Sequence, residues 1–235
     1  MDPLDIVSKL IIAFVLFIAS LSDYKSREID DKVWILGSIP LSIILIYRLY
    51  VGSIIFPLYL ASLIISIMLA STIWYTGIMG EADAIAIFFI GLFYPPTPKH
   101  LFSLCPFPII SVIFNSLIIA LIYALYNLFL NISKLKKENI FKEYEISLFA
   151  KILALATMRY IDKKEYKAKK YMYAPAETRK NGKKTLLFNL TVTEETPEPP
   201  DEKFWAVIYL PYVLFIFTGY ILSITVGCPL DFLLK

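Results

Sequence analysis

Long apolar runs, separated mostly by short polar joins, are the feature that most limits what this chain can fold into. A helix that crosses the hydrocarbon core of a bilayer needs about 20 apolar residues. Six runs are candidates, over residues 4–21, 33–51, 53–78, 83–94, 107–130 and 204–226. Hydrophobic residues make up 58% of the chain, more than a soluble core of this length can enclose. The pattern predicts an α-helical polytopic membrane protein with six transmembrane helices, of which 83–94 is the shortest.

The placement of basic residues orients these helices. With the N-terminus outside, the inside loops are 23–32, 79–82 and 131–203, and they hold 19 of the 23 Lys and Arg residues. An excess of Lys and Arg in cytoplasmic loops is typical of membrane proteins. We therefore expect these three segments to face the cytoplasm of a multi-pass cell-membrane protein.

The polar stretch 131–203 predicts a small cytoplasmic α+β insert before the last helix. We expect a helix over 145–159 at the membrane surface and strands over 170–173 and 185–192. The turn signal Asn181-Gly182 would join these strands as a hairpin, and the proline-rich stretch 194–201 reads as a linker. The predicted division is a membrane domain 1–130, an insert 131–203, and a last span with the C-terminus, 204–235.

Two aspartates stand at the ends of apolar runs and on the same predicted side of the membrane. Asp23 closes the first run and Asp83 opens the fourth. Each has an ordinary interpretation, as a solvated carboxylate at a membrane boundary or as an acidic residue favoured at a helix N-terminus. Ionisable groups at membrane depth are costly, which favours a functional role. Two facing carboxylates that share one proton are the minimum apparatus of an aspartic protease.

The residues around both aspartates resemble the motifs of a peptidase family. The sequence Gly80-Glu81-Ala82-Asp83 is similar to the GxGD class of intramembrane aspartic proteases, and residues 23–29 resemble the aspartate-led motif of type IV prepilin and archaeal preflagellin leader peptidases. The resemblance covers roughly residues 1–95. It implies that Asp23 and Asp83 are catalytic and that Gly80 is the motif glycine. Gly80 would let a substrate backbone approach, and Ala82 would keep the entry to Asp83 narrow.

The resemblance also implies a substrate class. The protein would be an aspartic endopeptidase that removes a short basic leader from pilin-like or flagellin-like precursors at the cytoplasmic face. Asp30 and Ile85 stand where family members often carry proline and lysine. The four-cysteine insert of many bacterial members is absent, which favours an archaeal-type member. The residues do not distinguish preflagellin from prepilin as the substrate.

Two alternatives remain beside the aspartic peptidase. A non-enzymatic membrane scaffold or transporter subunit would carry the aspartates as boundary residues or as an ion site. A Ser–Lys peptidase would have to use Lys9, which is predicted at the far face of the membrane. We expect no cofactor and no nucleic acid partner, only the precursor and the lipid bilayer. One histidine, His100, and two cysteines are too few for a zinc site of ordinary ligand count.

The two cysteines, Cys105 and Cys228, both fall on the predicted exterior side. A disulfide could form there. Since the sequence gives no distance between them, the expected state is two free thiols.

Overall fold

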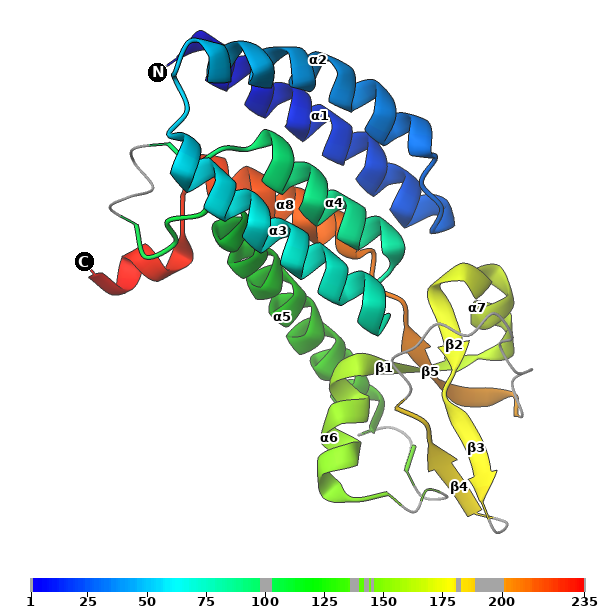
Figure 1. Ribbon diagram of the computed structural model, residues 1–235. Coiled ribbons are helices and arrows are strands. Elements are labelled where there is room, and N and C mark those ends of the chain that lie inside the picture. The colour runs from blue at the N-terminus through cyan, green and yellow to red at the C-terminus, as the bar shows by residue number, and fades with distance from the viewer. Residues whose placement is uncertain are drawn as a thin grey trace. The chain divides into compact units, whose positions relative to one another are not determined.

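A computed structural model describes residues 2–97, 103–135, 140–141, 144, 146–180, 183–188 and 201–234. The chain divides into two compact units (Figure 1). The helical unit comprises Met1–Ala120 and Pro211–Lys235, and the insert unit comprises Leu121–Leu210.

The helical unit is built from the apolar runs of the sequence. Its elements are α1 (Pro3–Ser26), α2 (Asp31–Tyr50), α3 (Phe56–Thr76), α4 (Glu81–Phe93), the first part of α5 (Pro108–Leu135), α8 (Tyr212–Thr225) and η3 (Pro229–Leu234). Local signals set several of the boundaries. Asp2 and Asp30 cap α1 and α2 by accepting hydrogen bonds from backbone N–H groups two residues on. Gly77, with φ 62°, ends α3.

Four helices among the described residues are long and apolar enough to cross a membrane: α1, α2, α3 and α5. The two remaining apolar helices of the unit are shorter, since α4 has 13 residues and α8 has 14. The chain is thus mostly helical with four candidate spans and a small sheet insert, and the count of six spans is not confirmed.

The expected last span, 204–226, is wrong in its first part. Residues Lys203–Ile208 form strand β5, and the helix begins only at Tyr212 after Pro211. A buried strand and a membrane segment are both continuous apolar runs, so hydropathy alone did not separate them. Pro211 therefore lies before a helix and not inside one.

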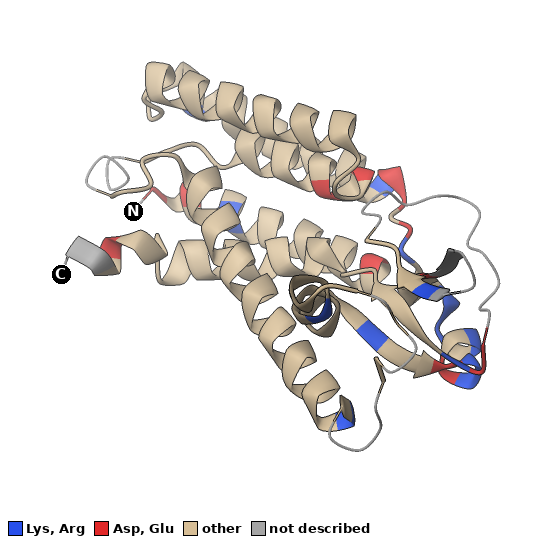
Figure 2. Cartoon of the chain, turned by 90° about the horizontal axis from the view of Figure 1, so that it is seen from below, with Lys and Arg blue, Asp and Glu red and all other residues tan. Residues whose placement is uncertain are grey.

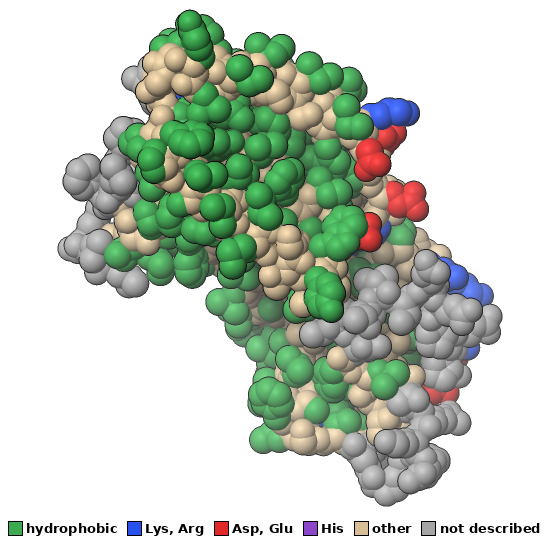
Figure 3. Space-filling view, viewed as in Figure 1, with side chains coloured by type: hydrophobic (Ala, Val, Ile, Leu, Met, Phe, Trp, Pro, Cys, Tyr) green, Lys and Arg blue, Asp and Glu red, His purple; other side chains and the backbone are tan. Residues whose placement is uncertain are grey.

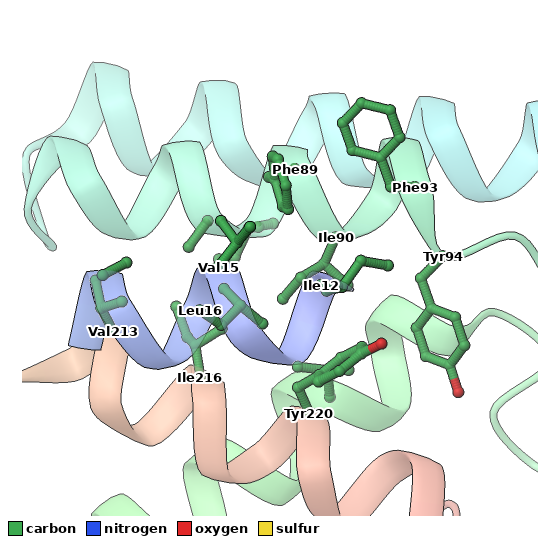
Figure 4. Close-up of a cluster of buried hydrophobic side chains, with 14 of the residues drawn as sticks. Ile12, Val15, Leu16, Phe89, Ile90, Phe93, Tyr94, Val213, Ile216 and Tyr220 are labelled. Carbon is green, nitrogen blue, oxygen red and sulfur yellow. The ribbon is translucent and has the colours of Figure 1, made fainter. Parts of the chain in front are cut away.

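The core of the helical unit lies where α1 packs between α4 and α8 (Figure 4). The labelled side chains of α1 are Ile12, Val15 and Leu16, and they meet Phe89 and Ile90 of α4 and Val213 and Ile216 of α8. Burial of these side chains stabilises the unit and holds the middle of α1 between α4 and α8.

The outer surface of the helical unit is apolar, as expected for a membrane domain. Figure 3 shows hydrophobic side chains over most of its visible face. Exposed large apolar residues occur along α1, α2 and α3, among them Phe14, Leu36 and Met68. Charged residues lie mostly at helix ends and in the insert unit (Figure 2). This distribution agrees with helices surrounded by lipid.

The insert unit combines the second part of α5 with short helices and two small sheets. Its further elements are α6 (Leu148–Thr157), β1 (Met158–Asp162), α7 (Lys163–Ala168), η2 (Lys170–Met172), β2 (Tyr173–Pro175), β3 (Glu177–Lys180), β4 (Lys183–Leu186) and β5 (Lys203–Ile208). Strand β5 lies between β1 and β2 and is antiparallel to both. Strands β3 and β4 form a separate antiparallel pair.

The expected hairpin is confirmed in position and corrected in its first strand. Lys180 pairs with Lys183, so β3 and β4 flank residues 181–182, which lie outside the described residues. The predicted strand 170–173 is wrong, because residues Lys170–Met172 form a 3-10 helix. The second strand ends at Leu186, and residues 189–192 and 194–200 lie outside the described part of the chain.

The expected helix over 145–159 is present but shorter. It runs from Leu148 to Thr157, and Met158 already belongs to β1. Residue 145 is not among the described residues. The helix ends where backbone pairing with β5 begins, at Met158 opposite Val207.

Cys105 and Cys228 are joined by a disulfide with a Cα–Cα distance of 6.0 Å. The expectation of two free thiols is therefore wrong. Packing of α5 against α8 brings together two positions that are 123 residues apart in the sequence. A Cβ added to Gly219 of α8 would lie 2.7 Å from the backbone of Val112 in α5, which shows how close the two helices are.

Candidate active site

Asp23 lies in the last turn of α1 and is buried, with 7% of its surface exposed. Arg27 follows one turn later as the C-cap, in the left-handed region with φ 62°. Its Nη1 lies 3.4 Å from Oδ1 of Asp23. Residues four apart on a helix share one face, so the local sequence itself places this cation beside the carboxylate.

The N-terminus of α8 supplies Asp23 with a second partner. The first N–H groups of a helix have no carbonyl partner within it. The N-cap of α8 is Pro211, which provides no side-chain cap. Instead, the backbone of Val213 hydrogen-bonds with the carboxyl group of Asp23. The other carboxylate oxygen, Oδ2, is buried and makes no close hydrogen bond within the described residues.

Asp83 lies in the first turn of α4 and is also 7% exposed. Its Oδ2 accepts a hydrogen bond of 3.0 Å from the N–H of Gly80, the N-cap residue. In return, the N–H of Asp83 donates to the carbonyl oxygen of Gly80 at 3.0 Å. This reciprocal pair satisfies two backbone groups at the helix start and holds the carboxyl group near the N-terminus of α4.

The structure brings Asp23 and Asp83 together. Helix α1 packs on α4 in the core, and the charges of Asp23 and Arg27 both act on the carboxyl group of Asp83. Tyr212, at the start of α8, interacts electrostatically with Asp83 as well. The two buried carboxyl groups therefore lie at neighbouring ends of α1, α4 and α8, close enough for the charge of Asp23 to act on Asp83.

Gly80 and Ala82 occupy different environments beside this cluster. Gly80 is exposed, has an ordinary φ of −65°, and an added Cβ would meet Oδ2 of Asp83 at 3.5 Å, a normal contact. The fold therefore does not require glycine at position 80. Ala82 is half-buried and packs against the helical core.

Sequence reasoning missed three neighbours of the aspartates: Arg27, Tyr212 and Val213. The spacing of Arg27 from Asp23 was a signal that could have found it. Nothing in the sequence connects positions 212 and 213 with the two aspartates, because only the packing of α8 brings them there. Among the described residues, no group of three or more His, Cys, Asp or Glu side chains could hold a metal ion.

Lys9, which a Ser–Lys peptidase would need, is engaged elsewhere. Its Nζ lies 2.7 Å from Oδ2 of Asp5, and Arg48 approaches the other oxygen of Asp5 at 3.3 Å. This ionic cluster ties the start of α1 to the end of α2, at the opposite end of α1 from Asp23.

The fold and the cluster define a polytopic helical protein with candidate membrane spans and a buried pair of carboxyl groups at adjoining helix ends. Residues 10–125 match the model of the type IV leader peptidase family, a region that contains both aspartates. Through this region the chain belongs to that family, and membership implies peptidase activity of the kind that removes prepilin-type leader peptides. No curated protein matches the chain significantly.

Proposed function

We propose that this protein is a membrane aspartic endopeptidase in which Asp23 and Asp83 are the catalytic pair. The observation that carries the proposal is the electrostatic interaction between two buried carboxyl groups, from α1 and α4, inside the region that matches the family. Burying two interacting carboxyl groups is costly unless their charges are compensated or one of them is protonated. A hydrolase that needs one base and one acid has a use for such an arrangement.

The partners of the two groups support an assignment of roles. Asp23 has a guanidinium and a helix N-terminus beside it, and both stabilise its carboxylate form. A second negative charge next to it is disfavoured, so Asp83 would carry the shared proton.

Hydrolysis would then proceed without a covalent intermediate. The Asp23 carboxylate takes a proton from a water molecule, and the oxygen of that water attacks the scissile carbonyl carbon. The Asp83 O–H donates a hydrogen bond to the carbonyl oxygen. When the C–N bond breaks, the leaving amine takes up a proton from the pair.

The proposed substrates are pilin-like or flagellin-like precursors with a short basic leader ahead of a hydrophobic helix. A bond just before that helix has an extended, accessible backbone, whereas a bond inside the helix has its carbonyl hydrogen-bonded. Exposed Gly80 beside Asp83 offers a place where such a backbone could approach. The basic leader would remain in the cytoplasm, in agreement with the positive-inside rule.

The proposed arrangement in the membrane has six crossings, with the short helices α4 and α8 completing the four longer ones. Helix α4 spans only about 20 Å at 1.5 Å per residue, so its ends lie near or below the membrane surfaces. The proposal places the aspartates at the cytoplasmic face.

The test is cleavage of a prepilin-like and a preflagellin-like precursor, each co-expressed with the protein and scored by a mobility shift. Asp23→Asn and Asp83→Asn are each expected to abolish cleavage, because asparagine keeps the shape but cannot exchange the proton. The double variant should be no worse than either single one, since the residues act as a unit. Asp30→Asn and Asp31→Asn are matched controls, because both side chains are exposed in the neighbouring loop and helix start.

The amount of protein in the membrane must be equal for all variants, so that a loss of cleavage does not simply reflect a loss of protein. Cleavage at a near wild-type rate by Asp23→Asn or by Asp83→Asn would remove that residue from the catalytic pair. If both variants retained cleavage, the aspartates would be structural, and the aspartic mechanism would be wrong. The relative rates on the two precursors identify the natural substrate class.

A further inference from the structure

Helix α6 exposes an apolar side in the insert unit. Leu148 and Phe149 are each 75% exposed, and Ile152 and Leu153 continue the same side one turn later. The opposite side, with Ala154 and Leu155, packs into a core that contains Trp205. Figure 3 shows hydrophobic side chains grouped over the visible outer side of α6. Four large apolar side chains on one face of a short helix are too many to be ordinary surface residues.

Two asparagines of α5 form hydrogen bonds with the backbone at the end of α6. Asn127 and Asn131 are fully buried and lie one turn apart on α5. The Nδ2 group of Asn131 donates to the carbonyl oxygens of Leu155 at 2.8 Å and of Met158 at 2.7 Å, and Asn127 donates to the same carbonyl of Met158 at 2.8 Å. The last carbonyls of a helix lack partners within it, so these bonds fix where α6 ends along α5.

This attachment lies within the apolar length of a candidate membrane span. Asn131 precedes the end of α5 by about 6 Å and Asn127 by about 12 Å, at 1.5 Å per residue. At the same level, Leu125 and Phe129 of α5 are exposed, and the exposed polar residues Ser133 and Lys134 follow only after them. If α5 crosses the bilayer, the anchored end of α6 lies at the depth of lipid-exposed side chains.

We propose that α6 lies in the lipid–water interface and buries its apolar side, Leu148, Phe149, Ile152 and Leu153, in the acyl boundary of the bilayer. The occupant is lipid, because the exposed side of α6 is apolar and the end of α6 is held by buried hydrogen bonds along an apolar stretch of α5 whose outer side chains are exposed. Amphipathic helices of this kind lie in the plane of the interface. The role of α6 is to hold the insert unit to the membrane, independently of the catalytic proposal.

The test uses the full-length protein in lipid nanodiscs with a nitroxide label on single cysteines. The native cysteines are paired with each other, so a thiol-reactive label in the absence of reductant attaches only to the new position. The labelled variants are Phe149→Cys and Ile152→Cys on α6. Phe129→Cys on α5 is the lipid-facing reference, and Lys164→Cys, exposed on the charged helix α7, is the aqueous reference.

Collision rates with oxygen, which concentrates in hydrocarbon, and with a nickel chelate, which stays in water, are then compared. Phe149→Cys and Ile152→Cys are expected to favour oxygen over the chelate, as Phe129→Cys does, while Lys164→Cys shows the reverse. A water-like ratio at both α6 positions would overturn the proposal. Protection from both reagents, with spin–spin broadening between labels, would also overturn it and indicate that a second copy of the chain covers α6.

Discussion

The carboxyl group of Asp83 serves the fold as well as the proposed chemistry. It caps α4 by accepting the Gly80 N–H, and the same group is proposed to carry the catalytic proton. Asparagine at position 83 can still accept that hydrogen bond through its amide oxygen. The Asn substitution therefore separates capping from proton transfer, whereas alanine would remove both.

A residue-scale prediction concerns Gly80. The Gly80→Ala variant should fold and insert normally, because its Cβ would meet only Oδ2 of Asp83, at 3.5 Å, and φ stays at an ordinary −65°. Cleavage should nevertheless fall by roughly tenfold or more, because a methyl group there holds the substrate backbone away from its reactive position. The measurements are the cleavage rate and the thermal unfolding midpoint. Unchanged cleavage would show that the substrate does not approach over Gly80.

At the scale of elements, the contact between α3 and α4 depends on one small residue in each helix. An added Cβ on Gly91 would overlap the side chain of Ser66. Ser66 is fully buried, and its hydroxyl donates to the carbonyl oxygen of Ser62 within α3. Small residues let helix backbones approach closely in membranes, and here they fix the position of the helix that carries Asp83.

We predict that Gly91→Ala lowers the free energy of unfolding by about 1–3 kcal/mol, the usual cost of overpacking. Thermal unfolding in detergent would measure it. The second-site change Ser66→Gly should restore much of the loss, because it removes both the Cβ and the hydroxyl that the added methyl group would strike. Ser66→Ala is the matched control and should not restore it, since its Cβ remains. Equal rescue by both changes would contradict this account of the contact.

In the insert unit, a buried glutamate links β3 to its neighbours. Oε1 of Glu177 accepts hydrogen bonds from the Tyr144 hydroxyl and, at 2.6 Å, from the Trp205 N–H of β5. Burial raises the pKa of Glu177 above its ordinary value of 4.5, although these hydrogen bonds and the charge of Lys184 act in the opposite direction. The protonated form is therefore favoured more in the folded than in the unfolded state.

This raised pKa predicts a direction of pH dependence. The protonated Glu177 side chain contributes to the stability of the folded state. This contribution is fully present below pH 4.5 and is lost as the pH rises through the raised pKa of Glu177 in the folded state. The glutamine of the Glu177→Gln variant does not titrate. Relative to that variant, the amides of the insert unit in the natural protein should thus become less protected from hydrogen exchange as the pH rises toward neutral. Hydrogen exchange of the β5 amides, corrected for the intrinsic rate at each pH, would measure this. A difference between the two proteins that is constant with pH would contradict it.

At the scale of the whole molecule, the proposed topology places the loop after α1 and the join after α2 on opposite faces of the membrane. Single cysteines at Lys32 and Ser53, both exposed, report on these two segments. The native cysteines are bonded and should not react without reductant. Ser53→Cys should react with an impermeant maleimide in intact cells, and Lys32→Cys only after the membrane is opened. Reaction of both from one side would mean that α2 does not cross.

The sequence by itself determined the elements whose cause is local. Apolar length predicted the positions of α1, α2, α3 and α5, and the Asn181-Gly182 signal located the β3–β4 pair, because helix length and turn chemistry depend on neighbouring residues. Asp23 and Asp83 could also be singled out, since a carboxylate at the edge of an apolar run is unusual wherever it occurs.

Only the tertiary structure decided the rest. The apolar residues 204–208 became a strand because β1 and β2 pair with them on either side. The two cysteines met because α8 packs on α5, and Asp23 gained Val213 as a partner because the uncapped start of α8 packs beside α1. Each of these outcomes joins positions far apart in the chain. Hydropathy and turn signals describe neighbours in sequence, so they cannot report which distant backbone group or side chain will satisfy a buried polar atom.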